Sequence, residues 1–115
     1  MEPSETRNVL TQLRRGTLEY CVLALLHDDA RYAFDLVNDL SQVDGLVTSE
    51  GTLYPLLSRL RREGLVTTSW QESPSGPPRR YYRATPAGRR ALKSFAAEWN
   101  RFRDGVDGLL TRGVE

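Results

Sequence analysis

The stretch from Ser49 to Val66 constrains the fold most, because one helix-length segment combines an apolar stripe with a polar, basic face. Leucines recur at helical spacing on one side, which predicts that they are buried: Leu53, Leu56, Leu57 and Leu60. The other side carries hydrogen-bonding groups and positive charges: Ser49, Thr52, Tyr54, Ser58, Arg59, Arg61 and Arg62. Such a helix can dock on a small core and present its polar side to a polyanion.

The two ends of this helix have recognisable signals, but its interior contains a proline. Ser49 is the predicted N-cap, and Gly64 is the predicted stop. A proline at position 55 removes an intrahelical hydrogen bond if the helix begins at the cap, at a cost of about 3 kcal/mol. One alternative is that the helix begins near Thr52, so that Pro55 falls in its first turn. The other is that Pro55 lies inside the helix and its strain is tolerated because the site is functionally important.

Two further helices precede this segment. Apolar residues at helical spacing predict the first over Thr17–His27, with Thr17 as its N-cap, and the second over Tyr32–Leu40. The single Cys21 lies on the apolar side of the first helix and is interpreted as a core residue.

The chain then changes to an extended pattern. Leu65–Gln71 and Arg79–Ala84 are predicted strands, and the turn-rich segment Glu72–Pro78 is the predicted tip of a hairpin between them. Thr85 and Pro86 are the expected cap and first residue of a last helix. The predicted class is therefore α+β, with three helices, a hairpin and a long C-terminal helix.

The last helix carries apolar residues in alternating steps of three and four, which is a heptad pattern. The stripe consists of Leu92, Phe95, Trp99, Phe102, Val106 and Leu109. Three helices followed by a basic hairpin are the layout of a winged helix-turn-helix, a fold that binds DNA. A winged domain of about 80 residues cannot cover the stripe on the last helix, so a homodimer through this helix is expected, with a contribution from residues before Gly16. The predicted organisation is a DNA-binding domain with an N-terminal extension over residues 1–84 and a dimerisation helix over residues 85–115.

Composition excludes several classes of function. One Cys and one His cannot form an intramolecular disulfide or a four-ligand metal site, and no cofactor is expected. The sequence contains no phosphate-binding glycine loop and no nucleophile–base motif, so we expect no enzyme activity. The sequence also lacks a membrane-spanning run and a signal peptide, which predicts a cytoplasmic protein.

The net charge of +1 conceals a strong segregation of charge along the chain. Residues 1–50 contain four Arg and nine acids, whereas residues 59–103 contain eleven Arg or Lys and three acids. The basic residues therefore gather in the part of the chain that holds the amphipathic helix and the hairpin, as expected for a protein that binds nucleic acid.

Three separate motifs resemble the PadR family of bacterial transcriptional regulators, and the resemblance covers about residues 14–110. The motifs are Gly16-Thr-Leu-Glu, then Ser49-Glu-Gly-Thr-Leu-Tyr-Pro-Leu-Leu-Ser-Arg-Leu with Glu63-Gly-Leu-Val, and finally Arg79-Arg-Tyr-Tyr-Arg-Ala-Thr-Pro-Ala-Gly. The single C-terminal helix resembles the short members of the family. One departure is Tyr32-Ala-Phe-Asp, which stands where the family usually has Tyr-Gly-Tyr-Glu.

The resemblance implies a winged helix-turn-helix and a homodimeric repressor that binds a palindromic operator on double-stranded DNA. The regulated gene would serve detoxification, efflux or aromatic-compound metabolism. The third helix would enter the major groove, and the hairpin would lie along the backbone. The candidate DNA-binding residues are Ser49, Glu50, Thr52, Tyr54, Arg59, Arg61, Arg79 and Arg80. Because a strand alternates faces, only one of the two hairpin arginines is expected to point at DNA.

Simpler explanations remain open for several of these residues. Tyr54 and Tyr82 could be aromatics that pack the hairpin on the helix. Arg61 and Arg62 could form a solvated helix face. Glu50 could read a cytosine amino group or only stabilise the helix N-terminus.

The resemblance also suggests a ligand. In some short PadR members a tryptophan from each subunit flanks a central pocket that binds flat aromatic molecules, and Trp99 is similarly placed, with Phe95 and Phe102 one step away. The alternative is that Trp99 is only a large interface anchor. For the whole protein, the alternative function is a winged-helix module that contacts another protein and does not bind DNA.

Overall fold

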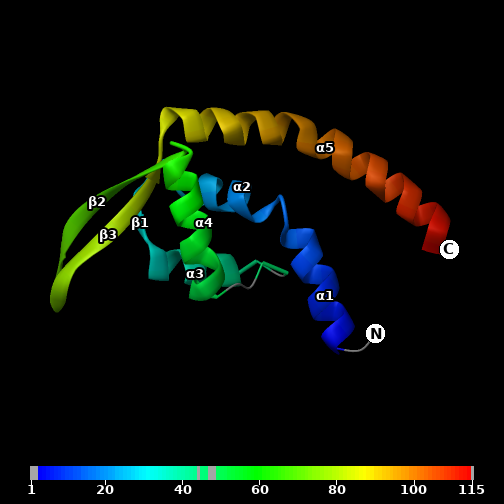
Figure 1. Ribbon diagram of the computed structural model, residues 1–115. Coiled ribbons are helices and arrows are strands. Elements are labelled where there is room, and N and C mark those ends of the chain that lie inside the picture. The colour runs from blue at the N-terminus through cyan, green and yellow to red at the C-terminus, as the bar shows by residue number, and fades with distance from the viewer. Residues whose placement is uncertain (1–2, 44, 47–48, 115) are drawn as a thin grey trace.

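The computed structural model describes residues 3–43, 45–46 and 49–114, which form a small antiparallel sheet and helices, the last of them long (Figure 1). The elements are α1 (Pro3–Arg14), α2 (Leu18–Leu25), β1 (Arg31–Tyr32), α3 (Ala33–Ser41), α4 (Glu50–Arg62), β2 (Val66–Ser73), β3 (Gly76–Ala84) and α5 (Pro86–Val114). The predicted α+β class and winged arrangement are confirmed. The ends of the two predicted domains, residues 1–2 and 115, lie outside the described residues.

The core lies where α2, α3 and α4 meet the base of the sheet. Its buried residues are Leu18, Val22, Leu23, Leu26, Ala33, Leu36, Leu40, Leu53, Leu57, Leu60, Val66, Tyr82 and Ala84. The α4 stripe is buried as predicted, except that Leu56 is only half-buried. Leu23 of α2 is fully buried. Each buried leucine contributes about 1.5–3 kcal/mol, so the leucine-rich helices supply most of the stabilisation.

The sheet has the order β1–β3–β2, and both pairs are antiparallel. The short strand β1 was not predicted. Tyr32 pairs with Tyr81 instead of beginning a helix, and α3 begins one residue later at Ala33. Two residues are too short for a strand to leave a periodic signal in the sequence.

The two strands of the hairpin are longer than predicted, and its tip is shorter. Pro74 and Ser75 form the turn, and Ser73 pairs with Gly76. The predicted tip over Glu72–Pro78 was therefore wrong, because most of these residues belong to β2 and β3. A register irregularity near Gln71–Ser73 accommodates the prolines, which cannot donate to a sheet ladder.

Helix α4 has the predicted ends. The hydroxyl of Ser49 accepts a hydrogen bond from the backbone N–H of Thr52 at 3.2 Å. At the other end, Gly64 has φ of 76°, and the N–H of Leu65 reaches the carbonyl of Leu60 at 2.9 Å, as in a Schellman motif. The helix is continuous from Glu50, so Pro55 lies in its interior and not in its first turn.

The N-terminal extension forms a helix, α1, that the sequence analysis did not predict. Thr17 follows it and occupies the N-cap position of α2, but its side chain does not cap that helix. The Thr17 hydroxyl donates back to the carbonyls of Leu13 at 2.9 Å and Arg14 at 3.2 Å. Thr17 therefore joins the end of α1 to the start of α2.

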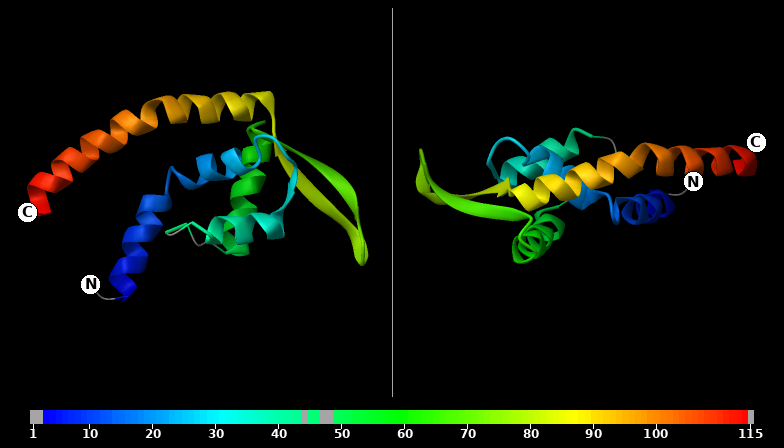
Figure 2. Two further views of the ribbon diagram at one scale, coloured as in Figure 1. Left: turned by 180° about the vertical axis from the view of Figure 1, so that it is seen from behind. Right: turned by 90° about the horizontal axis from the view of Figure 1, so that it is seen from above.

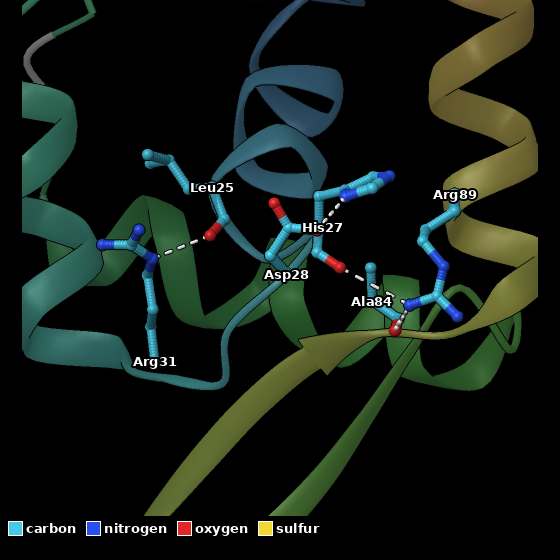
Figure 3. Close-up of polar contacts among 6 residues, drawn as sticks. All are labelled: Leu25, His27, Asp28, Arg31, Ala84 and Arg89. Atoms are coloured by element: carbon cyan, nitrogen blue, oxygen red, sulfur yellow. Dashed lines mark hydrogen bonds and ion pairs between the residues drawn. The ribbon is translucent and has the colours of Figure 1, made fainter.

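Arginine side chains satisfy the carbonyl groups at the end of α2 (Figure 3). Arg31 donates through Nε to the carbonyl of Leu25 at 2.7 Å. Arg89, from α5, donates to the carbonyls of His27 at 3.4 Å and Ala84 at 3.3 Å. These bonds supply partners that a helix end otherwise lacks, and they join α2 to β3 and α5.

The start of α5 is fixed against the turn between α4 and β2. The hydroxyl of Thr85 accepts from the N–H of Gly88 at 3.1 Å, as predicted for a cap, and donates to the carbonyl of Gly64 at 2.6 Å. Gly88 is the only buried residue among the described residues of α5. A Cβ atom at this position would collide with the backbone carbonyl of Leu65.

Beyond this junction, α5 runs away from the hairpin, and the two project toward opposite ends of the molecule (Figure 2). The molecule is accordingly elongated, with extents of 54 × 33 × 21 Å. None of the described helices is long and apolar enough to cross a membrane.

Replacing Gly88 by Ala should lower the free energy of unfolding by about 1–3 kcal/mol, because the added methyl group displaces backbone rather than a flexible side chain. Urea denaturation at a fixed protein concentration measures the change. Gly108→Ala, in the same helix with open space around its Cβ position, is the matched control and should be neutral or stabilise by up to about 1 kcal/mol. Equal unfolding midpoints for the two variants would contradict the close approach at Gly88.

Candidate nucleic-acid interface

The N-terminal end of α4 is open to solvent. Ser49, Glu50 and Thr52 are exposed, and Ser49 is held in place by its capping bond to Thr52. The first backbone N–H groups of a helix have no intrahelical acceptor, and the helix dipole adds positive potential there. This end of α4 can therefore bind an anion or meet base edges. Glu50 adds a negative charge that stabilises the helix N-terminus.

Tyr54 lies one turn further along α4 and is 40% exposed. Burial of its ring, together with the nearby charge of Glu50, raises the pKa of the Tyr54 phenol. The hydroxyl therefore stays protonated at neutral pH and can donate a hydrogen bond. Tyr82 differs, because it is buried in the core. Of the two roles that the sequence left open for this residue, the structure therefore supports packing.

The two arginines of α4 among the candidates have different surroundings. Arg59 contacts Glu63 at 3.1 Å and Glu19 of α2 at 3.5 Å, and its hydrogen bond to Glu63 is the main cause that raises its pKa. The two carboxylates thus already balance the charge of Arg59, and its ion pair with Glu19 connects α4 to α2. Arg61 is exposed, and its side chain forms no hydrogen bond or ion pair with any other residue that the structure describes.

The hairpin register separates Arg79 from Arg80. Directly opposed residues of an antiparallel pair share a face, and Arg80 is opposite Trp70 whereas Arg79 is opposite Gln71. The guanidinium of Arg80 lies 4.8 Å from the centre of the Trp70 ring, and that of Arg79 lies 4.9 Å from the centre of the Tyr32 ring. Both arginines stack on aromatic rings, but on opposite faces of the sheet.

Arg79 and Arg80 also have no counter-ion in the part of the chain that the structure describes. Neither guanidinium group forms a hydrogen bond or an ion pair there, so both charges remain available to an external anion. The hairpin tip and the N-terminal end of α4 point to the same side of the molecule, away from α5 (Figure 1, Figure 2).

The stripe on α5 divides into two parts. Leu92 packs against the core, and Phe95 stacks on Tyr20 of α2 with ring centres 4.1 Å apart. The sequence analysis did not identify Tyr20 as the partner of this stripe. The rest of the stripe is uncovered: Trp99, Phe102, Val106 and Leu109 are exposed, with Phe102 at 66% and Leu109 at 70%.

The predicted ligand residues lie together. The rings of Phe95, Trp99 and Phe102 follow one another, with centres 5.5 and 6.4 Å apart. They line one side of a cavity of about 310 Å³, whose other lining residues include Arg15 and Glu98. The cavity is open along the uncovered part of α5, so its walls are complete only if another surface covers them.

A second cavity lies between α1, α2 and the start of α4, and the sequence analysis missed it. It has a volume of about 570 Å³, and its lining includes Arg14, Ser49 and Thr52. Arg14 donates to the carbonyl of Gly45 at 3.0 Å, in the segment that leads to α4. Because α1 was not predicted, no sequence signal placed its side chains beside this helix.

Comparisons with known proteins give a consistent result. Residues 22–94 match the Transcriptional regulator PadR-like family. The chain is 38% identical to a PadR family transcriptional regulator from Eggerthella lenta, whose crystal structure superposes with a TM-score of 0.81 over 93% of each chain. It is 42% identical to a PadR-like transcription factor from Bacteroides fragilis, with a TM-score of 0.72 over 89% of this chain and 98% of that one. A transcriptional regulator of Mycobacterium tuberculosis is 39% identical over 83 residues, which are 72% of this chain and 76% of the relative.

Proposed function

This chain belongs to the PadR-like family of transcriptional regulators, and from that membership we propose that it is a homodimeric repressor that binds a palindromic operator and responds to a small molecule. The family consists of transcriptional regulators, so the chain is a regulator and not an enzyme. The proposed regulated gene serves detoxification, efflux or aromatic-compound metabolism. Access to the operator requires a cytoplasmic location, which is part of this proposal.

The observation that carries the proposed DNA contact is the joint position of the open end of α4 and the unpaired hairpin arginines. Ser49, Thr52 and Tyr54 offer hydroxyl groups at the major groove, and Arg79 and Arg80 offer charges to the backbone. Arg61 can reach a neighbouring phosphate. Arg59 contributes less directly, since its charge is paired with acids of the same chain.

Replacing Arg79 and Arg80 together by Ala should weaken binding to all duplex sequences, because phosphate contacts carry no sequence information. The dependence of log K on log salt should flatten by about 1 for each arginine that contacts a phosphate. Titration of a labelled duplex at several salt concentrations measures both. Arg112→Ala, at the far end of α5, is the control and should bind like the wild type. Unchanged affinity of the double variant at every salt concentration would remove the hairpin from the interface.

The uncovered part of α5 supports the proposed dimer. Trp99, Phe102, Val106 and Leu109 form a continuous apolar stripe that the described part of the chain leaves exposed. A second copy of the same stripe would cover it, as in other symmetric helical interfaces. Two subunits joined in this way can present two copies of α4 to half-sites about 34 Å apart.

A dimer should be found by sedimentation at micromolar concentration, neutral pH and moderate salt. Replacing Phe102 and Leu109 together by Glu should give a monomer, because the four buried carboxylates of the dimer would have no partners. Thr111→Glu adds a charge to the same helix but lies off the stripe, so this control should remain dimeric. A wild-type chain that sediments as a monomer would exclude the proposed interface.

The aromatic wall of Phe95, Trp99 and Phe102 supports the proposed ligand site. If Trp99 faces its symmetry mate across the dimer axis, two indoles can hold a planar aromatic or cationic compound by stacking. Such a compound changes operator affinity only if it prefers one dimer geometry over another.

Planar aromatic compounds should quench the tryptophan fluorescence of the wild type, and quenching should be lost in Trp99→Ala, which keeps Trp70 as its sole indole. Operator affinity should change in parallel with binding of the compound. If quenching persists in Trp99→Ala, or if bound compound leaves operator affinity unchanged, Trp99 is an interface anchor and not a ligand residue.

A further inference from the structure

The hairpin carries a tryptophan that the fold does not bury. Trp70 of β2 is 64% exposed, although the strand on which it lies packs its base into the core. In the register of the sheet it shares a face with the core residues Val66 and Ala84, but it lies further toward the tip. A single exposed apolar residue needs no explanation by itself. The side chain directly opposite indicates a role for this one.

That side chain is Arg80. Its guanidinium lies 4.8 Å from the centre of the Trp70 ring, and it forms no hydrogen bond or ion pair with any other residue that the structure describes. Its Nε atom is buried and lacks an acceptor among the described residues. The indole therefore fixes the position of a positive charge that none of the described residues neutralises.

Trp70 and Arg80 also line a concave surface of about 420 Å³ beside the hairpin tip. The rest of its lining comes from Tyr32, Arg79 and the tip residues Ser73, Ser75, Gly76, Pro77 and Pro78. Prolines have no N–H to donate, so this edge of the hairpin is a poor template for a strand from another protein. A cationic, hydroxyl-bearing hollow suits a phosphate better.

We propose that Trp70 and Arg80 form one unit that binds the sugar–phosphate backbone of a DNA duplex. The edge of the Arg80 guanidinium donates to a phosphate, because stacking on a ring leaves that edge free. The indole holds the guanidinium in place and lies against the adjacent deoxyribose. Trp70 is thus the positioning residue for Arg80. This inference rests on the proposed DNA binding, and it assigns a role to a residue outside the recognition helix.

A double-mutant cycle on duplex affinity tests the unit. Trp70→Leu keeps an apolar side chain but removes the aromatic face, and it should weaken binding about fivefold. Trp70→Phe keeps a ring and should restore most of the affinity. Arg80→Ala should flatten the salt dependence by about 1. If Trp70 acts through Arg80, the variant with Trp70→Leu and Arg80→Ala binds only slightly more weakly than Arg80→Ala alone.

Arg79 provides the matched control, because it lines the same concave surface but stacks on Tyr32 and not on Trp70. In a variant that carries both Trp70→Leu and Arg79→Ala, the loss of duplex affinity should equal the product of the losses in the two single variants. The proposal would be wrong if the losses of affinity from Trp70→Leu and Arg80→Ala multiplied in the double variant. It would also be wrong if Trp70→Leu bound the duplex with wild-type affinity. Absence of duplex binding by the wild type would instead refute the proposed function.

Fluorescence gives a second, independent measurement. Trp99→Phe leaves Trp70 as the sole indole, since the chain contains two tryptophans. Adding a duplex to this variant should shift or quench the emission of Trp70, and raising the salt concentration should reverse the change. Unchanged emission at a concentration where the duplex is bound would show that the indole does not lie against DNA.

Discussion

The contact between Gly88 and the carbonyl of Leu65 is the constraint on which the arrangement of the molecule depends. Helix α5 buries no other described residue, so its direction is set mainly where it begins. The Thr85 hydroxyl strengthens this junction by joining the cap of α5 to the carbonyl of Gly64. Arg89, one turn after Thr85, donates a hydrogen bond to the carbonyl of His27, just beyond the end of α2. A short segment thereby fixes the angle between the helix proposed to dimerise and the helix proposed to read DNA.

Aromatic rings have different partners at the two ends of the molecule. At the hairpin, rings hold arginines whose charges have no counter-ion among the described residues, as with Tyr32 and Arg79. Along α5, rings stack on each other, and Phe95 joins the series to Tyr20 of α2. The first arrangement presents charge to an external anion, and the second extends the core toward a surface that a second subunit can cover. Both are consistent with a regulator whose DNA contacts and subunit contacts lie on separate surfaces.

Much of the fold could be predicted because its signals are local. The leucine spacing of α4, the capping serine at 49 and the stop at Gly64 depend on residues within a few positions of each other. The same is true of Thr85 and Pro86 at the start of α5. Elements with weak local signals were missed or misplaced. Strand β1 is too short to show periodicity, and the hairpin tip is rich in turn residues that β2 and β3 nevertheless include. Helix α1 was also missed.

The sequence by itself determined which residues face the core, where the helices end, and that basic charge gathers on the third helix and the hairpin. These properties follow from periodicity, capping and composition, which act over one or two turns. Only the tertiary structure decided which arginines keep a free charge. Arg59 is paired because α2 brings Glu19 beside it, whereas Arg79 and Arg80 meet rings instead of acids. Such pairings join residues far apart in the chain, and no local pattern encodes the distance between them.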